Sequence, residues 1–343
     1  MLCVDVHHHY FSSDLKDHKK RTNDKIGWKT PEGNLGWSPE LSLKLMDASG
    51  VDISILSFPA IAAGEVSPKN RSLARERNRF AAQICAKHPS RFGFFATLPF
   101  LDDVQGVCRR AWYNTISNAP PGCLAEISYA LDELRADGIA LPSHCGEGPS
   151  ARYIGDDRFD RIWQELNRRR TVVFLHGTQT ESSTPFPHPW LGIPITEVCN
   201  ETFKAASHLV VTGRKRRYSD TKIILSHMGG SLPSLAARVA VLSNYMGCPL
   251  TPEEILEDFR SFYFDTALSS YGPNLQAMEA FALPDRLLFG TDLPAVDVSS
   301  AQWFTGKLKE HCVHDPAKLR RIMSENALKL FPNKALGMQV EIN

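Results

Sequence analysis

Eight short apolar runs, separated by longer amphipathic segments, constrain the fold of this chain more than any other feature. Their β-branched and aromatic residues favour strands. Segments such as 67–87, 158–169 and 232–245 carry apolar residues at helical spacing. Strands that alternate with helices pair in parallel, because parallel neighbours need long crossover connections. Eight such units predict a (β/α)8 barrel of the TIM type. The runs span residues 2–6, 53–58, 92–98, 138–141, 171–175, 222–226, 262–266 and 286–289.

A competing architecture for the same alternation is an open, doubly wound parallel sheet. Such sheets usually bind nucleotides through a glycine-rich turn, and neither GxGxxG nor GxxxxGK[ST] follows any of the runs. We therefore favour the barrel, as a single domain over residues 1–343 without an internal repeat. Two irregular stretches, near residues 16–39 and 177–196, are expected to be loop insertions, and long loops of this kind often cover a substrate.

Composition and charge limit the classes of partner. The net charge is +1, so nothing indicates a nucleic-acid or membrane partner. The basic run at residues 214–217 is a local exception, which we interpret as a solvated turn, with a phosphate-binding patch as the alternative. No run approaches the ~18 apolar residues of a membrane span. Because no secretory signal is apparent either, we expect a cytoplasmic protein.

The eight cysteines are spread along the chain without a CxxC pair or a close cluster. Disulfide frameworks and zinc ribbons both need cysteines at regular, close spacing. The pattern therefore predicts reduced, mostly buried thiols with no role in the chemistry.

Three consecutive histidines, His7 to His9, end the first expected strand. Alternate side chains of a strand share a face, so His7 and His9 point one way and His8 points the other. Two imidazoles on one face can converge on a single cation at the carboxyl end of a barrel strand. A metal site also needs ligands from elsewhere in the chain.

Three further polar residues stand where apolar runs end. His176, His227 and Asp292 each come at or just after the end of such a run, where barrel enzymes place their chemistry. We expect His7, His9, His176 and Asp292 to offer one cation three nitrogens and one carboxylate oxygen. This set leaves a position for water or substrate, as in a catalytic metal site.

A second metal ion would need a bridging acid or a modified lysine near the fourth run. Residues 138–144 read GIALPSH and contain no lysine, so we expect one ion. His144, in the same stretch, is interpreted as a loop residue without a catalytic role.

Four motifs around these residues carry a family resemblance. VDVHHHYF, FLHGT, LSHMGGSLPSLAARV and LLFGTDLP, in this order, resemble the metal-dependent decarboxylases of the amidohydrolase superfamily. That branch includes aminocarboxymuconate-semialdehyde, γ-resorcylate and iso-orotate decarboxylases. Four other stretches are similar to fungal 6-methylsalicylate decarboxylases, and the resemblance covers essentially the whole chain. These stretches are GTQTESSTPFPHPWLG, NETFKAASHLVVTGRKRRY, TPEEILEDF and FDTALSSYG.

The resemblance implies roles for the candidate residues. His7, His9, His176 and Asp292 would bind the metal ion, and His227 would be an acid/base group rather than a ligand. Imidazole ligands favour Zn²⁺, whereas the carboxylate and an oxygen-chelating substrate also suit Mn²⁺. No organic cofactor is implied.

Arg238 matches an arginine that some members lend across a dimer interface to bind the substrate carboxylate, which implies a homodimer. The chain also departs from its relatives in two places. Some aromatic-acid decarboxylases have Glu in place of His7, and the muconate type has an arginine just before the second strand, where residues 48–52 have none. A direct copy of the muconate enzyme's substrate pocket is therefore not expected.

The implied reaction is decarboxylation of a 2-hydroxybenzoate, foremost 6-methylsalicylate to m-cresol and CO2, in secondary metabolism. We expect Asp292 to deliver a proton to the ring carbon that bears the carboxyl group, assisted by His227. Phe58, Trp190 and Tyr271 are expected walls of a flat, apolar pocket. Two alternatives remain: a lactonase or amidase with the same ligands, and a non-catalytic metal-binding or scaffold protein.

Overall fold

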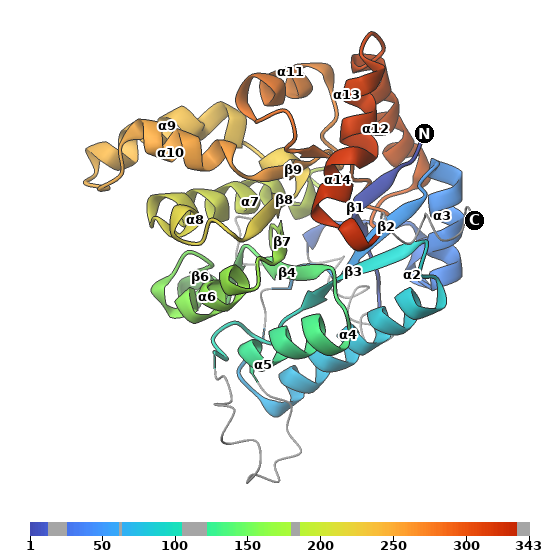
Figure 1. The fold of residues 1–343 in the computed structure, drawn as a ribbon, viewed down its shortest axis with the longest axis horizontal. Helices are drawn as coiled ribbons and strands as arrows, with labels where there is room; N and C mark the ends of the chain where they lie inside the picture. Colours follow the sequence, from blue (N-terminus) through green and yellow to red (C-terminus); the bar gives the residue numbers. More distant parts are fainter. Residues whose placement is uncertain (13–25, 62–63, 105–121, 180–185, 335–343) are drawn as a thin grey trace.

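The computed structural model describes residues 1–12, 26–61, 64–104, 122–179 and 186–334. Its centre is a sheet of eight parallel strands that follow one another in sequence order (Figure 1). A separate antiparallel pair lies in the loop after β4. The eight strands are β1 (Val4–His9), β2 (Ile53–Ser57), β3 (Phe92–Thr97), β4 (Gly138–Pro142), β7 (Val172–His176), β8 (Lys222–Leu225), β9 (Tyr263–Asp265) and β10 (Leu287–Leu288), and the pair is β5 (His144–Cys145) and β6 (Arg152–Tyr153).

Backbone hydrogen bonds between β1 and the chain after β10 bring the two edges of the sheet together. The N–H of Val6 donates to the carbonyl of Phe289 at 3.0 Å, and the N–H of Asp292 donates to the carbonyl of His7 at 2.9 Å. The predicted (β/α)8 architecture is therefore confirmed, as a nearly closed barrel. All eight expected strands are present, although β1 extends beyond the expected run, to His9.

Helices surround the barrel and connect its strands. The expected helices over 67–87, 158–169 and 232–245 correspond to α4, α6 and α9. Longer helices begin at side-chain caps where the sequence offers them: Ser67 accepts a hydrogen bond from the N–H of Asn70 at the start of α4. The main helices are α3 (Pro39–Ser49), α4 (Pro68–Lys87), α6 (Asp160–Arg168), α7 (Ile193–Val211), α9 (Leu232–Tyr245), α10 (Pro252–Arg260), α11 (Gly272–Phe281) and α12 (Val298–His311).

Shorter helical segments complete the fold. One of them, α2, falls inside the stretch expected to be a loop insertion near residues 16–39, and residues 13–25 of that stretch lie outside the described residues. No helix in the described part of the chain is long and apolar enough to cross a membrane. The short segments are α2 (Glu32–Leu35), α5 (Cys123–Ser128), α8 (Arg214–Arg217), α13 (Pro316–Arg320) and α14 (Asn326–Leu330), together with single turns of 3-10 or π-helix.

Strand β1 changes its pairing register with β2 between Asp5 and His8. Such an irregularity changes which side chains face the barrel interior. Val4 and Val6 belong to the buried inner cluster that also contains Phe174. The ring of His7 contacts Phe174 with centroids 4.9 Å apart. Apolar side chains and a candidate metal ligand of one strand therefore face the same interior.

The basic run at residues 214–217 forms α8 and is largely paired with acidic side chains. Three guanidinium groups form ion pairs within the chain, and the fourth cation, Lys215, is buried. The interpretation as a solvated turn is therefore wrong, because the run is a short helix with two buried residues, Arg214 and Lys215. Its ion pairs tie α8 to α6 and α10, which favours a structural role over a phosphate-binding patch. The pairs are Arg214 with Asp157 and Asp160, Arg216 with Glu254 and Asp258, and Arg217 with Asp160.

Lys215 is expected to reduce stability at neutral pH. Its ammonium lies over the ring of Phe262, 5.1 Å from the centroid, and burial lowers its pKa to about 8. In the unfolded chain the pKa of Lys215 is near 10.5. Between pH 8 and 10.5 the unfolded state therefore binds a proton at Lys215 that the folded state does not, so the free energy of unfolding rises with pH in this window. We expect Lys215→Met to raise the free energy of unfolding at pH 7 by about 1–3 kcal/mol.

Urea denaturation at pH 7, 9 and 10 checks this prediction. The difference between wild type and Lys215→Met should shrink as pH rises through this window, whereas Lys44→Met, at an exposed position, should show no such trend. A stability difference that is independent of pH would contradict the proposed cost of burying the charge.

Candidate active site

Four buried side chains from three parts of the barrel meet at the carboxyl ends of its strands. His7 and His9 come from β1, His176 ends β7, and Asp292 follows β10; their potential ligand atoms all lie within 4.8 Å of one another. The two Nε2 atoms of His7 and His9 are 3.2 Å apart, and the Oδ1 of Asp292 lies 3.1 Å from that of His9. The Nε2 of His176 is buried without a hydrogen-bond partner. Three imidazole nitrogens and a carboxylate oxygen form a donor set that fits a divalent cation.

The other ring nitrogens of these histidines are held in place by acceptors. The Nδ1 of His9 lies 3.1 Å from the hydroxyl of Ser57, and the Nδ1 of His176 lies 2.8 Å from the carbonyl of Gly177. A histidine that donates through Nδ1 presents the lone pair of Nε2 to a metal ion. These contacts therefore orient the rings toward a common point.

Asp265, which ends β9, is a site residue that the sequence analysis missed. Its Oδ2 lies 2.9 Å from the Nδ1 of His7, and its Oδ1 accepts hydrogen bonds from the N–H groups of His227 and Ala267, both at 3.0 Å. The side chain is fully buried. One carboxylate thus orients a candidate metal ligand and holds the backbone of His227. The sequence does contain a signal for Asp265, because this residue ends an apolar run just as His176 does.

Two carboxylates stabilise a proton on His7 within this cluster. Burial by itself would lower the pKa of His7, but the carboxylates of Asp265 and Asp292 raise it to about 10. Burial opposes ionisation of Asp292, yet His7 and His9 hold the pKa of Asp292 well below its usual range. A bound cation would take the place of the His7 proton, because the metal and the proton compete for the same lone pair.

His227 lies beside the four residues and faces the second oxygen of Asp292. Its Nδ1 is 3.0 Å from the carbonyl of Ala267, and its Nε2 is 4.0 Å from the Oδ2 of Asp292. A tight turn follows His227, and in it Met228 and the next two glycines have positive φ. A Cβ on Gly230 would lie 2.0 Å from the carbonyl oxygen of Cys199, so this position requires glycine.

Two other histidines lie outside the cluster. His8 turns away from it and contacts Asp5 and Ser42, at 3.2 and 2.9 Å. His144 is buried with its Nε2 3.6 Å from a carboxylate oxygen of Glu201 on α7. Neither belongs to the group of candidate ligands in the described residues.

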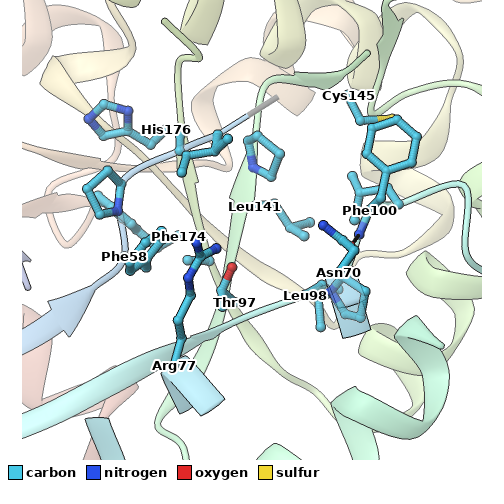
Figure 2. Close-up of a pocket in the computed structure, with 17 residues that line it drawn as sticks. Phe58, Asn70, Arg77, Thr97, Leu98, Phe100, Leu141, Cys145, Phe174 and His176 are labelled. Atoms are coloured by element: carbon cyan, nitrogen blue, oxygen red, sulfur yellow. Dashed lines mark hydrogen bonds between the residues drawn. The ribbon is translucent and has the colours of Figure 1, made fainter. Parts of the chain in front are cut away.

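A cavity opens beside the cluster, and His176 forms part of its wall (Figure 2). It encloses about 640 Å³, including space open to solvent. The wall is formed by the segments that follow β2, β3 and β4, together with side chains of β7 and α4. Most of the lining residues have apolar side chains, among them Phe58, Leu98, Phe100, Leu141, Cys145 and Phe174.

Comparison with known proteins places the chain in a family. The family model described as Amidohydrolase matches residues 4–332. The chain belongs to the amidohydrolase family. It is 37% identical to decarboxylase yanB of Aspergillus niger, over 96% of this chain and 87% of the relative. It is 36% identical to 6-methylsalicylic acid decarboxylase of Penicillium expansum, over 97% of both chains.

A solved dihydroxybenzoic acid decarboxylase from Polaromonas sp. JS666 has the same fold, with a TM-score of 0.77. The match covers 96% of this chain and 97% of that one at 22% identity, and that structure holds manganese and the inhibitor 2-nitroresorcinol. The predicted membership of the decarboxylase-containing branch of this superfamily is thereby confirmed.

In this amidohydrolase, only one of the three aromatic side chains that were expected to line the cavity does so. Phe58 lines the cavity, whereas Trp190 and Tyr271 do not. Trp190 is 82% exposed and packs against His188, and Tyr271 is half exposed and stacks on Trp303. The sequence indicated the loops that carry these rings but not the direction in which the side chains point.

Arg238 of the amidohydrolase lies on the exposed side of α9. Other side chains exposed near the end of this helix are apolar: Val241, Leu242, Tyr245 and Met246. Figure 1 shows α9 and α10 projecting from the barrel. Arg238 does not line the cavity of its own chain.

Proposed function

We propose that this amidohydrolase is a metal-dependent carboxy-lyase that removes CO2 from a 2-hydroxybenzoate, foremost from 6-methylsalicylate to give m-cresol. The observation that carries the proposal is the group of His7, His9, His176 and Asp292 beside a cavity that aromatic and aliphatic side chains help to line. Support also comes from relatives named as decarboxylases, which match nearly the whole chain at 36–37% identity.

The four residues would hold one divalent ion, Zn²⁺ or Mn²⁺. Such an ion would supply positive charge for the phenol oxygen and one carboxylate oxygen of the substrate, which lowers the pKa of the phenol and positions the ring. Three nitrogens and one oxygen suit both ions. No organic cofactor is needed for this chemistry, because the proton and the leaving CO2 balance the reaction.

Asp292 and His227 would move the proton. A proton is added to the ring carbon that bears the carboxylate, the bond to the carboxyl carbon breaks, its electron pair returns to the ring, and CO2 leaves. Asp292 suits this role because its Oδ1 faces His7 and His9 while its Oδ2 faces His227. We assign proton delivery to Asp292 as a relay: its carboxylate, kept ionised at rest by His7 and His9, takes a proton from His227 and passes it to the ring carbon.

We further propose that the active form is a homodimer, in which Arg238 of one copy reaches the substrate carboxylate in the other. Support comes from the exposed apolar surface around Arg238 on α9, a helix that projects from the barrel. Specific activity should then fall on dilution as the dimer dissociates, as followed by light scattering on the same samples. Full activity in a monomer would exclude this arrangement.

One incubation tests the proposed reaction. The purified protein is mixed with 6-methylsalicylate, with and without a chelator, and m-cresol is measured by chromatography with mass detection. Chelator-sensitive m-cresol supports both the reaction and the metal requirement. If metal-loaded protein forms no phenolic product from this or other 2-hydroxybenzoates but hydrolyses lactones or amides, the hydrolase alternative replaces the lyase.

A further inference from the structure

His8 stands between two candidate ligands in the sequence, and the proposed reaction leaves its imidazole unused. Its Nδ1 lies 3.2 Å from the Oδ2 of Asp5, and its Nε2 lies 2.9 Å from the hydroxyl of Ser42. Serine, histidine and aspartate in this order resemble the catalytic triad of acyl-transfer enzymes. All three side chains are fully buried, so the Ser42 hydroxyl has no access to a substrate. The network therefore needs a role other than nucleophilic catalysis.

The neighbours of His8 indicate which of its nitrogens carries the proton. The indole Nε1 of Trp37 donates to the Ser42 hydroxyl at 3.0 Å, which leaves the proton of that hydroxyl for the Nε2 of His8. The carboxylate of Asp5 can only accept a hydrogen bond. The neutral tautomer that satisfies both neighbours therefore carries its proton on Nδ1. In this tautomer His8 is a donor that orients the Asp5 carboxylate.

Asp5 in turn holds the backbone next to two candidate ligands that come from opposite ends of the chain. Its Oδ1 accepts hydrogen bonds from the N–H of His7 at 3.0 Å and from the N–H of Thr291 at 3.1 Å. Its Oδ2, which faces His8, also accepts a hydrogen bond from the Thr291 hydroxyl at 2.5 Å. Thr291 immediately precedes Asp292. One buried carboxylate thus fixes His7 relative to the segment that carries Asp292.

The backbone of Asp292 needs such support because its conformation is uncommon. Asp292 has a φ of 64°, in the left-handed region that is sterically unfavourable for residues other than glycine. The N–H of Asp292 donates to the carbonyl of His7 at 2.9 Å, and the N–H of Leu293 donates to the Thr291 hydroxyl at 3.2 Å. The Thr291 hydroxyl therefore bonds to Asp5 and also to the residue after Asp292. These bonds hold the Asp292 carboxylate at the ligand cluster.

We propose that Asp5, oriented by His8, is a positioning residue that sets the placement of His7 relative to Asp292 and thereby the affinity of the site for a divalent ion. The proposal rests on the proposed function, because it takes these residues as ligands of a metal ion. Neither Asp5 nor His8 lines the cavity, so both act through the ligands and not on the substrate. Groups that orient metal ligands in this way contribute about 10- to 100-fold to metal affinity.

Two substitutions of Thr291 separate the effect of its hydroxyl from that of its size. Thr291→Val keeps the shape but removes the hydroxyl, so Asp5 loses a donor and the N–H of Leu293 loses its acceptor. We expect Thr291→Val to weaken Mn²⁺ binding by about tenfold or more, and Thr291→Ser to keep an affinity close to that of the wild type. Competition between the metal-free protein and a chelating dye measures these affinities. Unchanged Mn²⁺ affinity in folded Thr291→Val would overturn the proposal.

A pair of substitutions at His8 tests the donor to Asp5. Both His8→Asn and His8→Gln remove the buried ring, so both should lower the free energy of unfolding. The amide nitrogen of asparagine can take the place of Nδ1 and still donate to Asp5, whereas the longer glutamine brings its amide to the place of Nε2, near Ser42. We expect His8→Gln to lose about tenfold in Mn²⁺ affinity and His8→Asn to lose less. A loss of the same size in both variants would contradict the proposal, because the ring and not its bond to Asp5 would then matter.

Thr221→Val is the matched control for replacing a buried threonine hydroxyl with a methyl group. Thr221 is buried just before β8, and its hydroxyl has no hydrogen-bond partner among the described residues. This variant should bind Mn²⁺ like the wild type. A loss of affinity in Thr221→Val as large as that in Thr291→Val would count against a specific role of the Asp5 network.

The electron paramagnetic resonance spectrum of bound Mn²⁺ gives a second readout, which responds to the arrangement of the ligands and not to stability. At saturating metal we expect the spectrum to change in Thr291→Val and to be restored in Thr291→Ser. None of these measurements needs a substrate. A wild type that binds neither Mn²⁺ nor Zn²⁺ would overturn the proposed metal site together with this inference, whereas wild-type affinity and spectrum in Thr291→Val would overturn this inference alone.

Discussion

Replacing His227 with glutamine is expected to lower kcat by about 10²- to 10⁴-fold while the amount of bound metal stays unchanged. The rate should fall because the Nε2 of His227 faces the Oδ2 of Asp292 at 4.0 Å. The metal content should stay unchanged because His227 lies outside the group of four candidate ligands. Glutamine keeps a polar side chain of similar reach but cannot exchange a proton near neutral pH. Steady-state kinetics with 6-methylsalicylate, together with elemental analysis of the dialysed protein, measures both quantities.

His314→Gln provides the control, because this substitution makes the same chemical change at an exposed residue that does not line the cavity. It should retain wild-type kcat and metal content. If His227→Gln instead lost metal in proportion to activity, His227 would be a ligand. Near-normal turnover in His227→Gln would remove it from the proton-transfer role.

Asp265→Asn is expected to weaken metal affinity by about 10- to 100-fold, because the carboxylate sets the orientation and basicity of His7. If the amide oxygen accepts from the N–H groups of His227 and Ala267, the amide NH2 faces the Nδ1 of His7 and cannot accept a hydrogen bond from it. The substitution therefore disfavours the His7 tautomer that presents Nε2 to a metal ion. Competition with a chelating dye measures the affinity. Most of the lost activity should return when metal is supplied in excess, because Asp265 acts through His7 and does not touch substrate.

Asp137→Asn is a matched control for removing a buried carboxylate elsewhere. Asp137 accepts a hydrogen bond from the N–H of Phe94 and pairs with Lys334, so its loss should affect stability and leave metal affinity unchanged. Wild-type metal affinity in Asp265→Asn would show that His7 does not depend on this carboxylate.

The strands could be predicted because their signal is local. Each buried strand is a short run of apolar residues between polar turns, and the alternation with amphipathic helices leaves few architectures. Strand ends were less accurate, as in β1, which extends beyond the expected run to His9. The register change near Asp5 depends on pairing with β2, which no local pattern encodes.

The candidate ligands could be predicted because a barrel brings the ends of all its strands to one face. A histidine or aspartate at such an end is visible in the sequence, which is how His7, His9, His176 and Asp292 were selected. Asp265 meets the same criterion but ends a strand of only three residues, Tyr263–Asp265, whose apolar run is too short to mark its end clearly. Trp190 and Tyr271 were expected in the cavity wall, but side-chain direction in a loop depends on tertiary contacts.

The contribution of α4 to the cavity wall had no distinguishing mark in the sequence, where this helix is one of several amphipathic segments. It follows from how α4 packs against β3, through the pair of hydrogen bonds between Asn78 and Thr97. Helix position relative to a sheet is set by such contacts between distant segments, not by helical periodicity.

By itself, the sequence determined the order of strands and helices and the polar residues at the strand ends, because both depend on neighbours along the chain. It also carried the motifs that resemble one family of decarboxylases. The tertiary structure alone decided which of these residues face one another, how Asp265 joins His7 to His227, and that α4 forms part of the cavity wall. These are relations between residues far apart in sequence, and they arise only when the barrel brings its edges together.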